Sequence, residues 1–172
     1  MLKAASIFLR SDFNRQDLEH VMDWLSNDHI TQYLHEFPDT PTEIEELIER
    51  VPSYLWPYHL NRDGKFFLIC REPEDSIGFV KCVGPANGAY EIVFAIGEER
   101  LWGNGYGAAA ISRTVSHLFF EQRATAVIAK IYHKNERSKR AITRCGFSQM
   151  QSGSRLSTYQ LTMQEYLKRL QG

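Results

Sequence analysis

The chain has 172 residues, 43% of them hydrophobic and 12% aromatic, which is enough to bury one core, and we expect residues 1–172 to form a single domain. The formal net charge of -1 argues against nucleic acid or an acidic membrane surface as a partner. Residues 1–30 lack both a basic segment followed by an apolar run and any stretch long enough to cross a bilayer, so we expect a cytoplasmic protein.

Strand and helix signals alternate in the first part of the chain. Residues 5–9 form a short apolar run that predicts a strand. Helical spacing follows, first in Leu18, Val21, Met22 and Leu25 and then in Ile44, Leu47, Ile48 and Val51. Thr40 and Glu43 form a capping box around Pro41, so the second helix is expected to begin at Pro41.

An aromatic segment comes next, and two prolines interrupt its helical spacing. Because Pro52 and Pro57 disfavour a continued helix, the segment is expected to be irregular. Its side chains serve either as core packing or as the wall of a ligand pocket, and both interpretations stay open. They are Tyr54, Trp56, Tyr58 and His59.

Three strands are predicted at residues 66–70, 77–83 and 89–96, and they form an antiparallel meander because Asn87-Gly88 is a strong hairpin signal. The second half then reads as a helix, a strand and a helix, followed by two closing strands at residues 148–151 and 156–162. The helices carry the apolar stripes Ile111, Val115, Leu118, Phe119 and Ser138, Ala141, Ile142, Cys145, and the strand between them is 126–131. The whole predicts a mixed α+β sheet.

The three cysteines point to no cross-link. Cys70, Cys82 and Cys145 are odd in number, far apart in the sequence and without a Cys-x-x-Cys pair. We therefore expect reduced core thiols and no metal site.

A glycine-rich loop joins the third meander strand to the next helix. Its residues are Trp102, Gly103, Asn104, Gly105, Tyr106 and Gly107. Glycines let the backbone approach a ligand, and the first helical turn offers unpaired N–H groups, so this arrangement predicts a phosphate or pyrophosphate site. Alanines follow Gly107 where a Walker loop needs Lys-Ser/Thr, and the G-x-G-x-G spacing differs from the G-x-G-x-x-G of dinucleotide-binding loops.

The stretch from Glu91 to Gly107, followed by Asn135–Ser138 and by Cys145–Phe147, resembles the Gcn5-related N-acetyltransferase (GNAT) family. The opening of the chain, with Phe8-Leu9-Arg10 and Asp17-Leu18, is similar to the branch that includes the ribosomal-protein N-terminal acetyltransferases. The resemblance covers almost the whole chain.

This resemblance implies one mixed, mostly antiparallel twisted sheet of roughly six to seven strands, flanked by helices and splayed between its fourth and fifth strands. It also implies acetyl-CoA as the acetyl donor and an amine as the acceptor. The positions that match the family's CoA-binding residues are Phe94, Ala95, Ile96, Trp102, Gly103, Asn104, Gly105, Tyr106, Gly107, Asn135 and Ser138.

Two positions depart from the family pattern. Trp102 replaces the usual Gln or Arg at the start of the loop, which leaves backbone donation intact. Ile142, seven positions after Asn135, replaces the tyrosine that protonates the leaving thiolate in many members. The resemblance to the ribosomal-protein branch implies Ser138, or a water, in that role.

Transfer of an acetyl group to an amine needs a proton acceptor. Glu91 is the candidate base, since strand alternation places it with Val93 and Ala95, and desolvation by such neighbours makes a carboxylate a better acceptor. Simpler interpretations remain. A glutamate at a strand end, such as Glu91, is often only solvated. Asn135 and Ser138 also suit the N-cap and the third position of a helix. His133 is either a possible base or a surface residue.

The expected function is direct transfer of the acetyl group from acetyl-CoA to a primary amine of a small molecule or a protein N-terminus. Two alternatives stay open, a non-catalytic acyl-CoA-binding or sensing module and a phosphate-binding domain for another nucleotide. The sequence does not name the acceptor, and both a monomer and a homodimer are compatible with it.

Overall fold

The computed structural model describes residues 5–34 and 40–172. Its strands are β1 (Phe8–Arg10), β2 (Gly64–Glu72), β3 (Asp75–Ala86), β4 (Ala89–Ile96), β5 (Ala126–Tyr132), β6 (Ser148–Ser152) and β7 (Leu156–Thr162). Its helices are α1 (Arg15–Leu25), α2 (Asp28–Thr31), α3 (Pro41–Arg50), α4 (Trp56–Leu60), α5 (Tyr106–Phe120), α6 (Glu136–Arg144) and α7 (Met163–Gln171), with short 3₁₀ turns η1 (Ser53–Leu55) and η2 (Glu99–Leu101).

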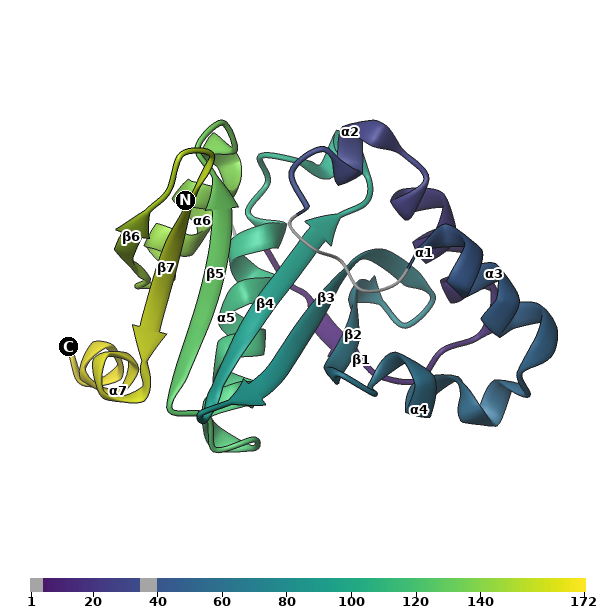
Figure 1. Ribbon diagram of the computed structural model, residues 1–172, viewed down its shortest axis with the longest axis horizontal. Coiled ribbons are helices and arrows are strands. Elements are labelled where there is room, and N and C mark those ends of the chain that lie inside the picture. Colours follow the sequence, from purple (N-terminus) through teal and green to yellow (C-terminus); the bar gives the residue numbers. More distant parts are fainter. Residues whose placement is uncertain (1–4, 35–39) are drawn as a thin grey trace.

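The described strands form one mixed sheet in the order β1-β2-β3-β4-β5-β7-β6. Strands β1 to β4 are the expected antiparallel meander, and β5, β7 and β6 are a second antiparallel group. The two groups meet through a parallel pairing of β4 with β5 that covers only residues 89–91 and 126–128. Beyond Glu91 the two strands diverge (Figure 1), so the predicted fold and its splay are confirmed.

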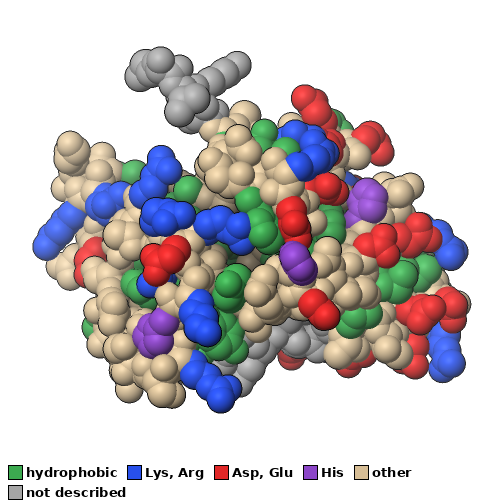
Figure 2. Space-filling view, turned by 90° about the horizontal axis from the view of Figure 1, so that it is seen from above, with side chains coloured by type: hydrophobic (Ala, Val, Ile, Leu, Met, Phe, Trp, Pro, Cys, Tyr) green, Lys and Arg blue, Asp and Glu red, His purple; other side chains and the backbone are tan. Residues whose placement is uncertain are grey.

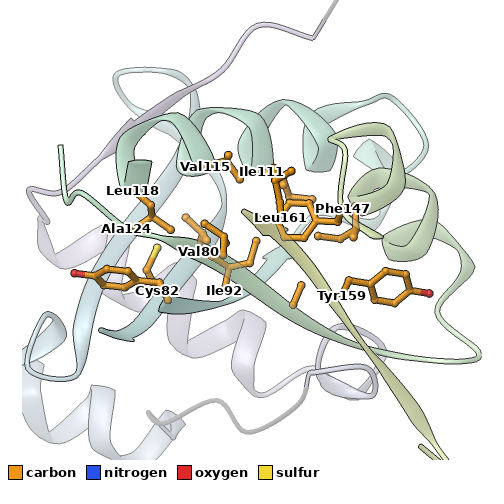
Figure 3. Packing of buried hydrophobic residues seen from close by; sticks show 14 of the residues in the cluster. Val80, Cys82, Ile92, Ile111, Val115, Leu118, Ala124, Phe147, Tyr159 and Leu161 are labelled. Atoms are coloured by element: carbon orange, nitrogen blue, oxygen red, sulfur yellow. The ribbon is translucent and has the colours of Figure 1, made fainter. Parts of the chain in front are cut away.

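Helices cover both faces of the sheet, because neighbouring strand residues point to opposite sides. On β3, Phe79 packs among side chains of α1, α3 and α4, whereas Val80 packs against α5. Figure 3 shows the second of these cores, in which Ile111 and Val115 of α5 lie over Val80 and Ile92 of the sheet. Each buried Leu or Ile of these two clusters stabilises the fold by about 1.5–3 kcal/mol.

Two helices begin where the sequence predicts them. Thr40 and Glu43 form the capping box of α3, and Asn135 is the N-cap of α6. Gly146 follows α6 with a φ of 97°, a left-handed conformation that favours glycine.

Three features differ from the sequence-based expectation. Strand β1 runs over Phe8–Arg10 instead of residues 5–9. The aromatic segment is helical, since Pro57 lies in the first turn of α4, where a missing N–H costs nothing. The closing strand β7 leads directly into α7, a helix that the sequence pattern did not predict. This helix begins with a capping box of Thr162 and Glu165.

The side chains of the aromatic segment lie in different environments. Trp56 is buried in the core, and its Nε1–H donates to the carbonyl oxygens of Leu47 at 3.1 Å and Val51 at 2.9 Å. Tyr54 and Tyr58 are 79% and 77% exposed. The core interpretation is therefore right for Trp56. Tyr54 and Tyr58 belong to the surface and line neither of the two cavities described for this structure.

The cysteines are free thiols, as expected. Cys70 and Cys82 are buried and Cys145 is half-buried. Burial raises the pKa of all three, and raises that of Cys82 to about 12. Within residues 5–34 and 40–172, no helix is both long and apolar enough to span a membrane.

Candidate active site

A cavity of about 320 Å³ opens where β4 and β5 diverge. Its walls come from the end of β4, the glycine loop, the start of α5, one face of α6 and the region of α2. Ten of the eleven predicted CoA-binding residues line it: Phe94, Ala95, Ile96, Trp102, Gly103, Gly105, Tyr106, Gly107, Asn135 and Ser138.

Asn104 is the exception, and it shapes the loop instead. Its side-chain Nδ2 donates to the carbonyl oxygens of Leu101 at 3.0 Å and Trp102 at 3.1 Å. The indole Nε1–H of Trp102 in turn donates to the Ile96 carbonyl oxygen at 2.9 Å. Side-chain hydrogen bonds therefore hold the loop both to itself and to the end of β4.

The glycine loop presents bare backbone to the cavity. Gly103 and Gly105 have φ values of 77° and 84°, which glycine adopts without steric cost. A Cβ atom built on Gly103 or Gly107 would meet nothing within 4 Å, so space for a ligand lies directly beside the chain. Gly105 is the N-cap of α5 and no side chain caps it, which leaves the first N–H groups of a 15-residue helix available to an anion.

Three arginines of α6 also line this cavity, and the sequence analysis missed them. Arg137, Arg140 and Arg144 recur at helical spacing and so share one face of α6. That spacing, directly after Asn135, is the signal that would have identified them. On the face of the molecule where β4 and β5 diverge, Lys and Arg gather over the α6 side and Asp and Glu over the α1–α3 side (Figure 2).

Asn135 and Ser138 combine a structural role with a position in the site. The Asn135 Oδ1 accepts the backbone N–H of Ser138 at 3.3 Å, which is the capping interaction expected of these residues. Both residues line the large cavity and also a second one of about 20 Å³. Capping and contact with a ligand are thus geometrically compatible.

Glu91 lies at the second cavity, at the last pair of the β4–β5 ladder. The two cavities share Tyr33, Leu34, Phe94, Asn135 and Ser138 as lining residues. Beside Glu91 the structure places a cation that the sequence analysis did not foresee, because Lys130 Nζ lies 3.3 Å from the Glu91 Oε2. The sequence predicted apolar neighbours for Glu91, namely Val93 and Ala95, but the side chain also forms an ion pair with Lys130. This pair is partly exposed, with 27% of the Glu91 side chain and 33% of the Lys130 side chain accessible.

Two other candidates lie away from both cavities. Ile142 is fully buried in the core between α6 and the sheet. His133 donates from Nε2 to the Gly153 carbonyl oxygen at 2.8 Å, and its Nδ1 lies 3.4 Å from the Ser157 hydroxyl. His133 thus ties β5 to the β6–β7 turn and lines neither cavity.

The region of α2 supplies the remaining wall. His29 and Tyr33 line the large cavity, and the His29 Nδ1 lies 3.1 Å from the Glu99 Oε1 of η2. Among the residues described, no group of three or more His, Cys, Asp or Glu side chains lies close enough to hold a metal ion.

The splayed sheet and the glycine loop at its cleft define an acetyltransferase. Residues 7–148 match the family described as the acetyltransferase (GNAT) domain, and the chain belongs to this family. It is similar to YoaA of Bacillus subtilis (strain 168), named as an uncharacterized N-acetyltransferase, with 26% identity over 134 residues that cover 77% of this chain and 74% of YoaA.

Solved structures share the fold over nearly the whole chain. The spermidine N-acetyltransferase of Vibrio cholerae, in complex with CoA and spermine, has a TM-score of 0.75 at 19% identity and covers 94% of this chain and 98% of its own. The aminoglycoside acetyltransferase AAC(6')-Ib, in complex with coenzyme A and kanamycin, has a TM-score of 0.74 at 18% identity, with 97% and 100% covered.

Proposed function

We propose that this enzyme transfers the acetyl group of acetyl-CoA directly to the primary amine of a small molecule or a protein N-terminus. The observation that carries the proposal is one continuous set of lining residues. It runs from the uncapped start of α5, which suits a phosphate group, to Glu91, which suits proton transfer.

The donor site fits the residues present. The backbone N–H groups from Trp102 to Gly107 would hold the pyrophosphate, and the open space beside Gly103 and Gly107 lets it approach closely. Pairing with β5 stops at Glu91, so the N–H groups of Phe94–Ile96 that face β5 lie outside the ladder. These groups would hold the pantetheine arm and donate to the acetyl carbonyl oxygen.

The reaction is aminolysis of a thioester, and acetyl-CoA supplies the activated acetyl group. Glu91 accepts a proton from the amine as its nitrogen bonds to the carbonyl carbon. The carbon–sulfur bond then breaks, and the Ser138 hydroxyl, or a water it holds, returns a proton to the thiolate. In this mechanism no covalent bond to the enzyme forms. Cys145 is not needed as a nucleophile and is poorly suited to that role, because burial raises the pKa of its half-buried thiol and the residue lines neither cavity.

A small-molecule amine is the favoured acceptor. Two solved relatives are complexes that contain spermine and kanamycin, both amines, and the large cavity leaves room beside Tyr33 and Leu34. Protein N-termini stay in the proposal because of the resemblance to the ribosomal-protein branch. We further propose that residues 1–172 act as one catalytic domain in the cytoplasm, as a monomer or homodimer, with no nucleic acid or membrane partner and no metal.

A panel of amines incubated with acetyl-CoA tests the proposal, with release of free CoA as the measurement. Glu91→Gln should lower kcat by about 10²–10⁴-fold, the usual contribution of a general base, while the Kd for acetyl-CoA stays unchanged. Ser138→Ala should lower kcat less, because a water can replace the hydroxyl. Glu121→Gln, at the end of α5 away from the glycine loop and 71% exposed, is the matched control and should keep full activity.

A second candidate function is a non-catalytic acyl-CoA-binding module. Ile142 favours it, because the core position of this residue leaves the site without the tyrosine acid found in many relatives. Binding of acetyl-CoA with no turnover of any amine, and no effect of Glu91→Gln, would support that module. A thermal shift with ATP or NAD but none with CoA would instead indicate a site for another nucleotide.

A further inference from the structure

Lys130 lies on the face of β5 that points away from the core beneath α5. Along this strand Val127, Ala129 and Ile131 are buried in that core, so Lys130 projects from the opposite face. A lysine on such a face usually extends its ammonium group into water. Here the side chain is only 33% exposed, and its Nζ lies 3.3 Å from the Glu91 Oε2. The charge of Lys130 is therefore directed at the carboxylate that the proposed reaction uses.

The splay of the sheet gives this ion pair its place in the site. Glu91 pairs with Ile128 at the end of the parallel β4–β5 ladder, and Lys130 lies two residues further along β5. The two strands diverge from that point on, so the ammonium group reaches back across the opening (Figure 1). Glu91 and Lys130 both line the small cavity, together with Asn135 and Ser138. The ion pair thus lies where the donor site and the candidate base meet.

Lys130 is the only ion-pair partner of Glu91 among residues 5–34 and 40–172. Lys81 lies on the same face of the sheet, opposite Val93, but its Nζ donates to the Leu60 carbonyl oxygen at the end of α4. A partly exposed ion pair contributes little to the stability of a fold. The contact between Lys130 and Glu91 is therefore explained better by what it does to the carboxylate than by bracing of the sheet.

We propose that Lys130 is a positioning residue for the base. Its ammonium group holds one oxygen of the Glu91 carboxylate, Oε2, and so directs the other oxygen toward the acceptor amine. The amine proton passes to that second oxygen as the bond between the nitrogen and the carbonyl carbon forms, and Lys130 keeps its own proton throughout. This inference rests on the proposed function, because it takes Glu91 as the base.

Steady-state kinetics of the full chain test the inference, with acetyl-CoA and the best acceptor of an amine panel that includes spermine, kanamycin and trialanine. Lys130→Met removes the charge at similar side-chain length and should lower kcat about 10- to 100-fold, because a misplaced catalytic group costs a factor of this order. The Kd for acetyl-CoA should stay unchanged, since the glycine loop and the start of α5 are intact. Lys130→Arg should keep most of the wild-type kcat, because a guanidinium group can pair with the same carboxylate.

A double-mutant cycle separates positioning from a merely structural role. If Lys130 acts through Glu91, Lys130→Met should lower kcat no further in the Glu91→Gln background. Lys139→Met is the matched control and should keep the wild-type kcat. Lys139 also forms an ion pair, with its Nζ 2.7 Å from the Glu136 Oε1, is 26% exposed and lines neither cavity. The unfolding temperature of Lys130→Met should stay within about 3 °C of the wild type, as expected for a partly exposed ion pair.

The outcomes separate this inference from the proposed function. Wild-type kcat in Lys130→Met overturns the positioning role and leaves acetyl transfer standing. The same holds if Lys130→Met lowers kcat by an equal factor with and without Glu91, or if Lys130→Arg is as slow as Lys130→Met. Wild-type kcat in Glu91→Gln overturns both the base and its positioning residue. Turnover of no amine in the panel overturns the proposed function and this inference together.

Discussion

The guanidinium carbon of Arg137 lies 3.5 Å from the ring centroid of Trp102, so a cation–π contact joins α6 to the glycine loop. The same indole donates to the Ile96 carbonyl oxygen, and one side chain therefore links α6, the loop and the end of β4. These segments meet only in the folded protein and together form three walls of the large cavity.

Arg137→Gln removes this contact and should raise the Kd for acetyl-CoA about two- to fivefold, because exposed cation–π pairs contribute about 0.5–1 kcal/mol. Titration calorimetry measures the effect. Arg113→Gln, on the exposed side of α5, serves as control and should bind like the wild type. An unchanged Kd in Arg137→Gln would show that the contact does not position the loop.

Gly105 and Gly107 should respond differently to alanine. Gly105 has a φ of 84°, so Gly105→Ala strains the loop, costs about 1 kcal/mol of stability and should weaken CoA binding about tenfold. Gly107 lies in the first turn of α5 without a left-handed φ, so Gly107→Ala should keep the stability of the fold, although its Cβ fills the space beside the chain that the pyrophosphate would need and should also weaken CoA binding. Thermal unfolding of the two variants tests this contrast in stability, and equal losses of stability in both would contradict it.

Ile142→Tyr should not supply a working acid at the position where the family resemblance implies a tyrosine. Ile142 is fully buried in the core, and a larger ring there should destabilise the fold by about 1–3 kcal/mol through overpacking. Ile142→Val, the conservative control, should cost about 0.5–1.5 kcal/mol and keep full activity. Denaturant unfolding measures both, and a stable Ile142→Tyr enzyme with raised kcat would refute this account of the site.

Stability should fall at high pH through Cys82. Burial raises the pKa of Cys82 from 9.0 to about 12, so the folded state holds its proton more tightly than the unfolded state does. The resulting stability is fully present below about pH 9 and is lost as the pH rises toward 12, by on the order of 4 kcal/mol.

Cys82→Ala should flatten this decline in the free energy of unfolding, as measured in urea between pH 8 and about pH 11. Cys70 and Cys145 also have raised pKa values and stay in place, so the difference between the two proteins isolates Cys82. A slope that is the same in both proteins would assign the loss to other groups.

Features that depend on residues close together in the chain were predictable from the sequence. The capping box at Thr40, the N-cap at Asn135 and the glycine turn at Gly146 each involve neighbours within one helical turn. The glycine loop belongs to the same class, because its φ angles and the free N–H groups of α5 follow from local chemistry. Alternation along each strand placed the core, and the antiparallel meander followed from its hairpin turns.

Three helices were not predictable, because their sequence patterns are short or are interrupted by neighbouring features. Periodicity needs several turns, so the four residues of α2 gave too little pattern. The prolines of the segment before β2 obscured α4, and the start of α7 was hidden by the strand that runs directly into it.

The sequence by itself determined the strands, the helices α1, α3, α5 and α6, the glycine loop and the family resemblance, because these depend on spacing within single segments. Only the tertiary structure decided which charges meet. The register of β4 against β5 brings Lys130 to Glu91, and the packing of α6 across the splay brings Arg137 onto Trp102. Pairing between segments far apart in the chain is set by burial of the whole sheet, and no local pattern encodes it.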